Sequence, residues 1–220
     1  MEARYRKDYD GEFVIAKSHW SQATKDQKRE WIPNAIENHH ISGRAVVVGS
    51  QIDREMFDYT RLQRHRGGLL GNKRLQTYGS GQLWETMVFD FFVTININIL
   101  SKLQKEKYSD SNIVFTSARH CINNPEQFYL IPHFVSMDDL AIAVYLAAFD
   151  GHEEIFLLGY NNDTPFGNDA WIDQINSIFA AYDSTKFFLI GAESNMPDMW
   201  RNNLNVSCMN YRSWVSHCDV

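Results

Sequence analysis

Small and polar residues follow most of the short apolar runs in this chain, and they are the residues that could do chemistry. Their amides, hydroxyls and carboxamides can hydrogen-bond a base, a ribose or phosphates without much fixed charge. The residues in question are Gly49 and Ser50, Asn96, Ser117, His133, Gly159 with Asn161, and Glu193. We therefore expect a binding site for a polar small molecule, provided that the fold brings these positions together.

Two of these residues are candidates for acid or base chemistry. His133 follows Pro132 at the end of an apolar run, and histidine titrates near neutral pH. A hydrogen-bonded histidine without a catalytic role is the alternative. Glu193 could also act as a base, but only if burial raises its pKa toward the working pH. No third ligand follows His39 and His40 at a spacing typical of metal sites, so the sequence predicts no metal site.

The elements that must position these residues are short runs rich in β-branched and aromatic side chains. Several lack the alternation of a half-exposed strand, and continuous apolar runs are typical of parallel strands covered on both faces. The predicted strands are Ala45 to Gly49, Phe89 to Ile95, Ile113 to Thr116, Phe128 to Ile131, Ile155 to Gly159 and Phe187 to Gly191. In such sheets, ligands bind beyond the carboxyl ends of the strands. Gly49 and Gly159 are thus expected at the same edge.

The strongest helix signal lies between two of these strands. Ser136 is the predicted N-cap, and Asp138 and Asp139 follow where carboxylates stabilise the first turn. The body LAIAVYLAAF is apolar almost all round, which predicts a buried helix, and Gly151 supplies a stop. Strand, helix and strand together make a βαβ unit with a right-handed crossover.

Weaker signals complete the domain. Residues 169–182 have the spacing of an amphipathic helix, a helix is predicted from Pro197 to Leu204, and Val206 to Trp214 is a predicted last strand. We interpret residues 1–44 as an N-terminal extension or cap, and residues 45–220 as a nucleotide-binding type of domain. The expected fold is a single α/β domain, Rossmann-like, with a mostly parallel central sheet and helices on both faces.

Composition excludes several classes of protein. The net charge is -6, and the basic residues cluster between Arg61 and Arg74. With a pI near 5.7, an extended nucleic-acid groove is not expected. Three cysteines without paired spacing indicate a reducing, cytoplasmic setting, and neither a signal peptide nor a membrane span is predicted.

Several motifs carry a resemblance to a known family. The stretch SMDDLAIAVYLAAFDGHEEIFLLGYNN, Ser136 to Asn162, resembles the segment of bacterial sialyltransferases in which an apolar helix leads into a strand ending in Gly-x-Asp. VVVGSQ with the later FDYTRL is similar to that family's first strand and glycine turn. GLLGNKRL and FDFFVTIN resemble its next two strands, and KFFLIGAESN resembles the strand that delivers its general base. The resemblance spans about Ala45 to Met209.

The resemblance implies a glycosyltransferase of the sialyltransferase type, or a relative, that binds a sugar nucleotide, CMP-linked in that family, and a glycan acceptor. It implies that no metal or other cofactor is needed, and that Glu193 or His133 is the base. The nucleotide-binding positions that it implies are Gly49, Ser50, Asn72, Asn96, Ser117, Gly159 and Asn161.

Departures from the family pattern leave other functions open. Only the first glycine of the family's loop is kept, at Gly49, its Gly-x-Asp carboxylate is Asn161 here, and its histidine is replaced by Ala192 and Glu193. One alternative is a binding or interaction protein that retains the fold without catalysis. Another is a different nucleotide-dependent transferase. The sequence also leaves open whether the chain forms a homo-oligomer.

Overall fold

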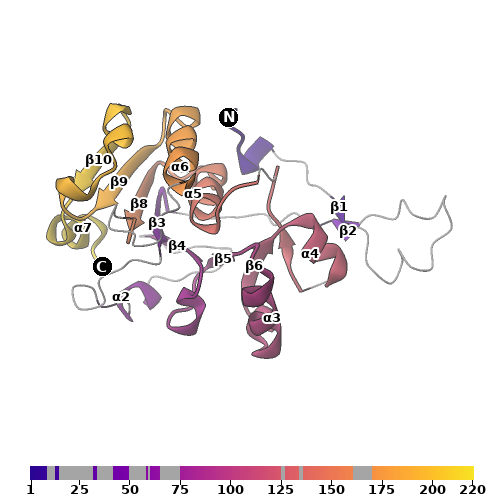
Figure 1. Ribbon diagram of the computed structural model, residues 1–220. Helices are drawn as coiled ribbons and strands as arrows, with labels where there is room; N and C mark the ends of the chain where they lie inside the picture. The colour runs from indigo at the N-terminus through magenta and orange to yellow at the C-terminus, as the bar shows by residue number, and fades with distance from the viewer. Residues whose placement is uncertain are drawn as a thin grey trace.

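The chain folds around one eight-stranded sheet in which every neighbouring pair of strands is parallel (Figure 1). The structure is a computed structural model and describes residues 1–8, 13–14, 32–33, 42–49, 58, 60–64, 75–124, 127–133, 136–160 and 170–220. The strand order is β10-β9-β8-β3-β4-β5-β6-β7. The strands are β3 (Arg44–Val48), β4 (Gln76–Ser80), β5 (Phe91–Val93), β6 (Ile113–Thr116), β7 (Tyr129–Leu130), β8 (Glu154–Leu158), β9 (Lys186–Ile190) and β10 (Val206–Met209). The predicted Rossmann-like α/β domain is confirmed.

The first strand of the sheet lies near its middle. β3 pairs with β4 on one side and with β8 on the other, with Val48 opposite Leu158 in the second pair. From β3 the chain adds β4 to β7 toward one edge, and it then returns to add β8 to β10 toward the other. Strand order therefore reverses between β3 and β8, which is the topological switch point of the sheet.

Helices cover both faces, and each face has its own hydrophobic core. One core includes side chains of α5 (Asp139–Asp150) and α6 (Ala170–Ala181), and the other includes side chains of the remaining helices (Figure 1). Those helices are α2 (Thr60–Gln63), α3 (Ile97–Lys105), α4 (Ala118–Asn123) and α7 (Tyr211–Cys218). Short 3-10 turns make up the rest: η1 (Arg6–Asp8), η4 (Leu83–Glu85), η5 (Tyr108–Asp110), η6 (Glu193–Asn195) and η7 (Asp198–Asn202). The prediction of helices on both faces is thus confirmed.

The α5 helix is buried along nearly its whole length, as its apolar sequence predicts. Residues 141–150 are all buried. Its N-cap is Asp138, whose carboxylate accepts from the Leu140 amide at 2.9 Å, so the predicted cap at Ser136 is wrong by two residues. Gly151 ends the helix at a φ of 90°, a conformation that glycine adopts without steric cost. The helix therefore begins at the carboxyl edge of the sheet and ends at the opposite edge.

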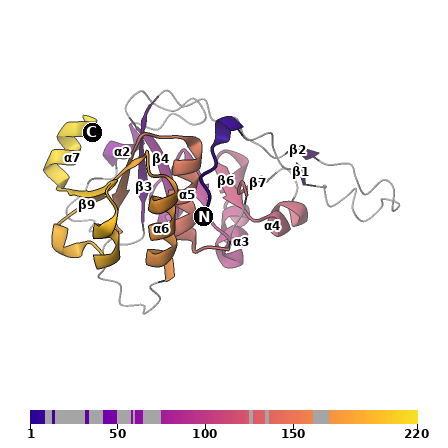
Figure 2. The same ribbon diagram turned by 90° about the horizontal axis from the view of Figure 1, so that it is seen from above.

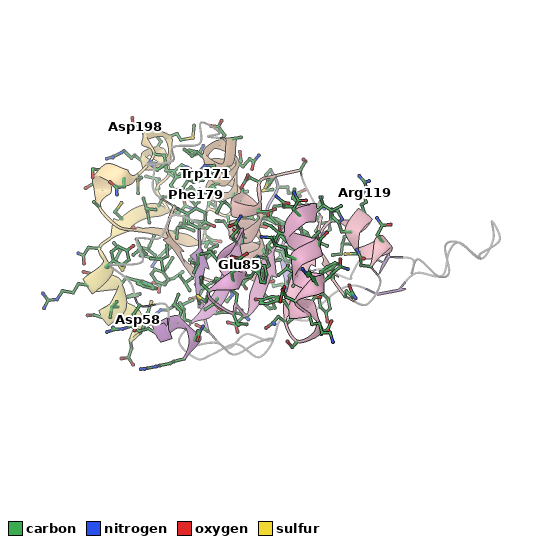
Figure 3. All side chains as sticks on the ribbon, turned by 60° about the horizontal axis from the view of Figure 1, so that its bottom comes forward. Asp58, Glu85, Arg119, Trp171, Phe179 and Asp198 are labelled. Carbon is green, nitrogen blue, oxygen red and sulfur yellow. The ribbon has the colours of Figure 1, made fainter. Side chains whose placement is uncertain are left out.

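The α6 helix is amphipathic, in agreement with its spacing. Trp171 and Phe179 point into the core between the helix and the sheet, whereas Glu85, Arg119 and Asp198 lie at the surface (Figure 3). The indole of Trp171 packs edge-on against Trp200, which is fully buried. This face of the sheet is thus closed by aromatic packing.

The C-terminal segment differs from its prediction. The last strand ends at Met209, and the residues predicted to continue it form α7 instead. Asn210 starts that helix, because its side-chain oxygen accepts from the Ser213 amide at 2.9 Å. The helix predicted from Pro197 to Leu204 is the shorter 3-10 turn η7. Neither α3 nor α4 was predicted, and neither was β4.

Parts of the segment before β3 are also placed. In both views, a two-stranded antiparallel pair, β1 (Phe13–Val14) with β2 (Ile32–Pro33), lies beside α4 at the far end of the sheet (Figure 2). Residues 1–8 lie against the core that includes α5 and α6, and Arg6 is buried there. Among the helices described, none is long and apolar enough to cross a bilayer.

Candidate functional site

The switch point brings Gly49 and Gly159 into contact at the carboxyl edge of the sheet. The Gly49 amide donates to the Leu158 carbonyl at 2.7 Å, directly beyond the last paired residues of β3 and β8. A methyl group at Gly49 would lie 2.6 Å from the Gly159 carbonyl oxygen and 3.0 Å from the Tyr160 ring, so no other residue fits. Gly159 itself has a φ of 77°. The two glycines let the ends of β3 and β8 approach each other closely at the switch point, the place where ligands bind in open parallel sheets.

A carboxyl group not identified from the sequence lies at the same edge, above β5. Asp139, in the first turn of α5, accepts hydrogen bonds from the Thr94 hydroxyl at 2.6 Å and from the Ile95 amide at 2.8 Å. Burial raises the pKa of Asp139, and the two hydrogen bonds only partly oppose this rise. The sequence shows Asp139 only as a helix-start residue, because its partners lie more than forty positions away. Asp139 ties α5 to the end of β5.

Asn96 and Ser117 begin the helices that follow β5 and β6. The Asn96 side-chain oxygen accepts from the Asn98 amide at 2.9 Å, which leaves its NH2 group available to donate elsewhere. Ser117 is at the N-cap of α4, but its hydroxyl makes no capping hydrogen bond. Both residues lie on the side of β3 away from β8, roughly 10 Å and 14 Å along the sheet at about 4.8 Å per strand. They share the switch-point edge without touching Gly49.

His120 is also close to this edge. Its side chain hydrogen-bonds the Ile95 backbone, which tends to raise its pKa, but burial and the nearby Arg119 charge lower the pKa overall. The lowered pKa favours the neutral imidazole, which can both donate and accept a hydrogen bond at this edge.

The two predicted bases are in different places. Glu193 follows β9 in the η6 turn, where its side chain is 80% exposed and 3.6 Å from Arg201. His133 follows β7, the last strand on the opposite side of the sheet. The structure does not bring these two residues together. Ser50, Asn72 and Asn161 lie outside the described residues, and β4 begins after Asn72 rather than ending at it.

His133 lines a cleft of about 430 Å³ on the outer surface of the α5 and α6 layer. Arg4 lies beside it, with its guanidinium 2.8 Å from the imidazole. Arg4 was not identified from the sequence, because it is more than a hundred positions from His133 and lies in no motif.

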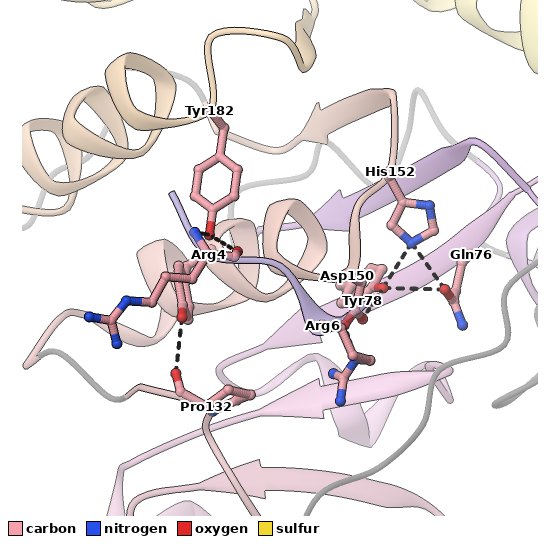
Figure 4. Close-up of polar contacts among 9 residues, drawn as sticks. Arg4, Arg6, Gln76, Tyr78, Pro132, Asp150, His152 and Tyr182 are labelled. Atoms are coloured by element: carbon pink, nitrogen blue, oxygen red, sulfur yellow. Dashed lines mark hydrogen bonds and ion pairs between the residues drawn. The ribbon is translucent and has the colours of Figure 1, made fainter. Parts of the chain in front are cut away.

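A buried polar cluster lies at the opposite edge of the sheet, near the amino ends of the strands. The Tyr78 hydroxyl donates to Asp150 at 2.6 Å and lies 2.9 Å from the His152 imidazole, while Asp150 pairs with Arg6 (Figure 4). Burial and then the Asp150 charge raise the pKa of Tyr78 well above its ordinary value. This cluster is enclosed by the fold, so we assign it a structural role.

Within the described ranges, no three histidine, cysteine or acidic side chains converge in a way that could hold a metal ion.

Comparison with known proteins identifies no relative. No protein-family model matches the chain, and neither the curated proteins nor the solved structures searched gave a match. Functional inference therefore depends on the geometry of the chain itself.

Proposed function

We propose that this protein binds a sugar nucleotide above β3 and β8, as a sialyltransferase-like glycosyltransferase. The observation that carries the proposal is the reversal of strand order between β3 and β8, with the Gly49 and Gly159 turns in contact there. In open parallel sheets, ligands bind at this point because two helices and their loops diverge and leave a crevice. CMP-linked sugars are the first donors to test, in keeping with the family resemblance.

Polar groups at neighbouring strand ends support the same proposal. The Asn96 NH2 group and the Ser117 hydroxyl are not consumed by helix capping, and Asp139 is a partly buried carboxyl group on the same side. Such groups fix the orientation of a small ligand in a site of this class. In this proposal Asn96 and Ser117 contact the nucleotide, and Asp139 positions the end of β5.

Isothermal titration with CMP, UDP and GDP tests the proposal directly. We expect saturable heat with at least one nucleotide, with CMP as the leading candidate. An absence of heat with all three nucleotides would end the nucleotide assignment.

Two substitutions locate the binding site. Ser117→Ala removes a hydroxyl without removing a helix cap, so binding should weaken about fivefold while the melting temperature stays unchanged. Asn96→Asp keeps the capping oxygen but removes the NH2 donor, and it should weaken binding by a similar factor. Ser207→Ala, on the exposed side of β10, is the matched control. Equal affinities for all three variants and the wild type would place the nucleotide elsewhere.

A binding protein without transferase activity is the second candidate, and the exposure of Glu193 favours it. At 80% exposure this carboxylate lacks the apolar surroundings that a base of this type needs. Slow hydrolysis of a donor sugar separates the candidates. A transferase should turn over the donor and lose turnover in Glu193→Ala, whereas a binding protein should bind the nucleotide and leave the donor intact.

A further inference from the structure

A second candidate site lies outside the switch-point crevice, in the cleft of about 430 Å³ on the α5 and α6 layer. Its walls are the first residues of the chain, the loop after β7, and the facing sides of α5 and α6. Met137 and the ring of Tyr145 supply apolar surface, while Ser136 and Gln174 supply polar groups. A mixture of apolar walls and a few polar groups is typical of small-molecule sites.

The backbone around Arg4 is held firmly in place beside this cleft. The Tyr182 hydroxyl donates to the Arg4 carbonyl at 2.7 Å, and the Arg4 amide donates to the Tyr182 hydroxyl oxygen at 3.3 Å (Figure 4). Two residues later, Arg6 forms a buried ion pair with Asp150. The position of the Arg4 backbone therefore does not depend on the guanidinium contacts of its side chain.

The Arg4 guanidinium has no close carboxylate partner among the described residues. Its nearest such group is Glu2 at 3.8 Å, and Glu2 is 82% exposed, so this pair is a weak surface contact. The closer contact is with His133 Nδ1 at 2.8 Å. Because a guanidinium can only donate, Nδ1 must accept, and the neutral imidazole then carries its proton on Nε2. Arg4 thus presents donors at the cleft, and His133 Nδ1 accepts from its guanidinium and orients it.

The other polar wall residues are oriented by contacts of their own. The Gln174 side-chain oxygen accepts from the Asp138 amide at 2.8 Å, which leaves its NH2 group as a donor. The Tyr145 hydroxyl donates to the Pro132 carbonyl at 3.0 Å and thereby holds the backbone directly before His133. The Gln174 NH2 group and the Arg4 guanidinium are therefore donors at the cleft, and the exposed Glu2 carboxylate also lines it.

The backbone of His133 is in an unusual conformation. Its φ is 45°, in the left-handed region that non-glycine residues rarely adopt. Such strain persists where the surrounding structure requires a particular side chain, and it concentrates at functional sites. Here the strained residue is the one that orients Arg4.

We propose that this cleft binds a small organic anion, with the acidic group on Arg4, which His133 orients, and an apolar body against Met137 and Tyr145. A carboxylate or a phosphate monoester has the required chemistry, because a guanidinium pairs with either through two parallel hydrogen bonds. The inference does not depend on nucleotide binding at the switch point.

Isothermal titration with 4-fluorobenzoate tests the proposal. Phenyl phosphate, acetate and 4-fluorobenzamide serve as comparison ligands. We expect 4-fluorobenzoate or phenyl phosphate to bind, acetate to bind more weakly because it lacks the apolar body, and neutral 4-fluorobenzamide to bind least. Which acid binds more tightly distinguishes a carboxylate site from a phosphate site. Failure of both acids to bind, or equal binding of the benzamide, would overturn the proposal.

Substitutions assign the binding to this cleft. Arg4→Ala should weaken acid binding roughly tenfold or more, because a hydrogen bond to a charged group is lost, while the backbone contacts with Tyr182 persist. Arg201→Ala removes an equal charge from a remote surface and should leave binding unchanged. If both arginine variants lose the same affinity, overall charge is responsible and the cleft is not the site.

His133 variants separate a binding role from a structural one. Asn and Gly both tolerate the left-handed conformation, so His133→Asn and His133→Gly should fold with melting temperatures near that of the wild type. Both should nevertheless weaken acid binding, and His133→Gly the more, since it leaves no side chain to orient Arg4. Unchanged affinity in both variants would remove His133 from the site.

Discussion

At the scale of single residues, the sequence indicates which side chains could act in a site but does not show which residues they contact. His133 and Glu193 were candidates because each follows an apolar run, and the structure places the first in a cleft beside Arg4 and the second on the surface. The contacts that separate the two residues come from segments far away in the chain. Arg4, which pairs with His133, belongs to no pattern that a reader of the sequence could recognise.

Arg6 shows how much one side chain can depend on such distant contacts. It is 9% exposed, pairs with Asp150 across 144 positions, and lies over the rings of Phe115 and Phe149. Arg6→Met removes the cation and leaves the Asp150 carboxylate buried beside Tyr78. We expect the free energy of unfolding to fall by about 3 kcal/mol, measured by urea denaturation. Lys7→Met, at the exposed neighbouring position, should change it by less than about 0.5 kcal/mol, and equal effects would mean that the ion pair contributes nothing.

Glu154 makes stability depend on pH. Burial tends to raise its pKa, but hydrogen bonds from His217 at 3.0 Å and Arg44 at 2.9 Å outweigh burial and hold the pKa below its ordinary value of 4.5. Since the pKa is lower in the folded state, the stabilisation is present above pH 4.5 and is lost as pH falls through the folded pKa.

Glu154→Gln should therefore lower the free energy of unfolding by about 1 kcal/mol at neutral pH, and the difference should shrink toward zero as the pH falls below 4.5. Denaturation at a series of pH values measures this, with the exposed neighbour in Glu153→Gln as the control. A difference that is the same at every pH would show that ionisation of Glu154 is not its cause.

At the scale of elements, apolar runs predicted most of the strands. They did not predict β4, because its buried residues are mostly polar. β4 reads QTYGS, which has no apolar run, yet all five residues are buried. The Asp90 carboxylate accepts hydrogen bonds from the Thr77 amide at 2.8 Å and from the Thr77 hydroxyl at 3.0 Å. A methyl group at Gly79 would lie 2.5 Å from the ring of Phe89. Polar side chains of β4 form hydrogen bonds with residues elsewhere in the chain, so only the structure identifies β4 as a central strand.

The close approach of β3 and β8 gives a prediction at this scale. Gly49→Ala places a methyl group against the Gly159 carbonyl oxygen, a backbone atom that cannot move aside cheaply. We expect a loss of about 2 kcal/mol in the free energy of unfolding, measured by chemical denaturation. Gly43→Ala, just before the other end of the same strand, meets only the Glu153 side chain at an ordinary 3.5 Å and should be nearly neutral. If both variants unfold alike, the contact between the two turns is looser than the structure indicates.

At the scale of the whole molecule, the fold class was predictable because continuous apolar strands separated by helices admit few arrangements. Strand order was harder, since nothing local states that β3 lies between β4 and β8. The prediction that Gly49 and Gly159 share an edge depended on that order, and the structure confirms it. The C-terminal helix was missed because Tyr211 to Trp214 carries a strand-like mixture of aromatic residues, whereas the Asn210 cap decides the outcome.

The central place of β3 matters while the protein is being made. β3 leaves the ribosome long before β8, because Arg44 and its register partner Glu154 are 110 positions apart. At about 5 to 20 residues per second, translation takes roughly 5 to 20 seconds to supply that partner. Until then the nascent chain presents an apolar strand with one unpaired side, the kind of surface that mispairs with other chains. Among the strands described, β3 thus waits longest during translation for one of its partners in the sheet.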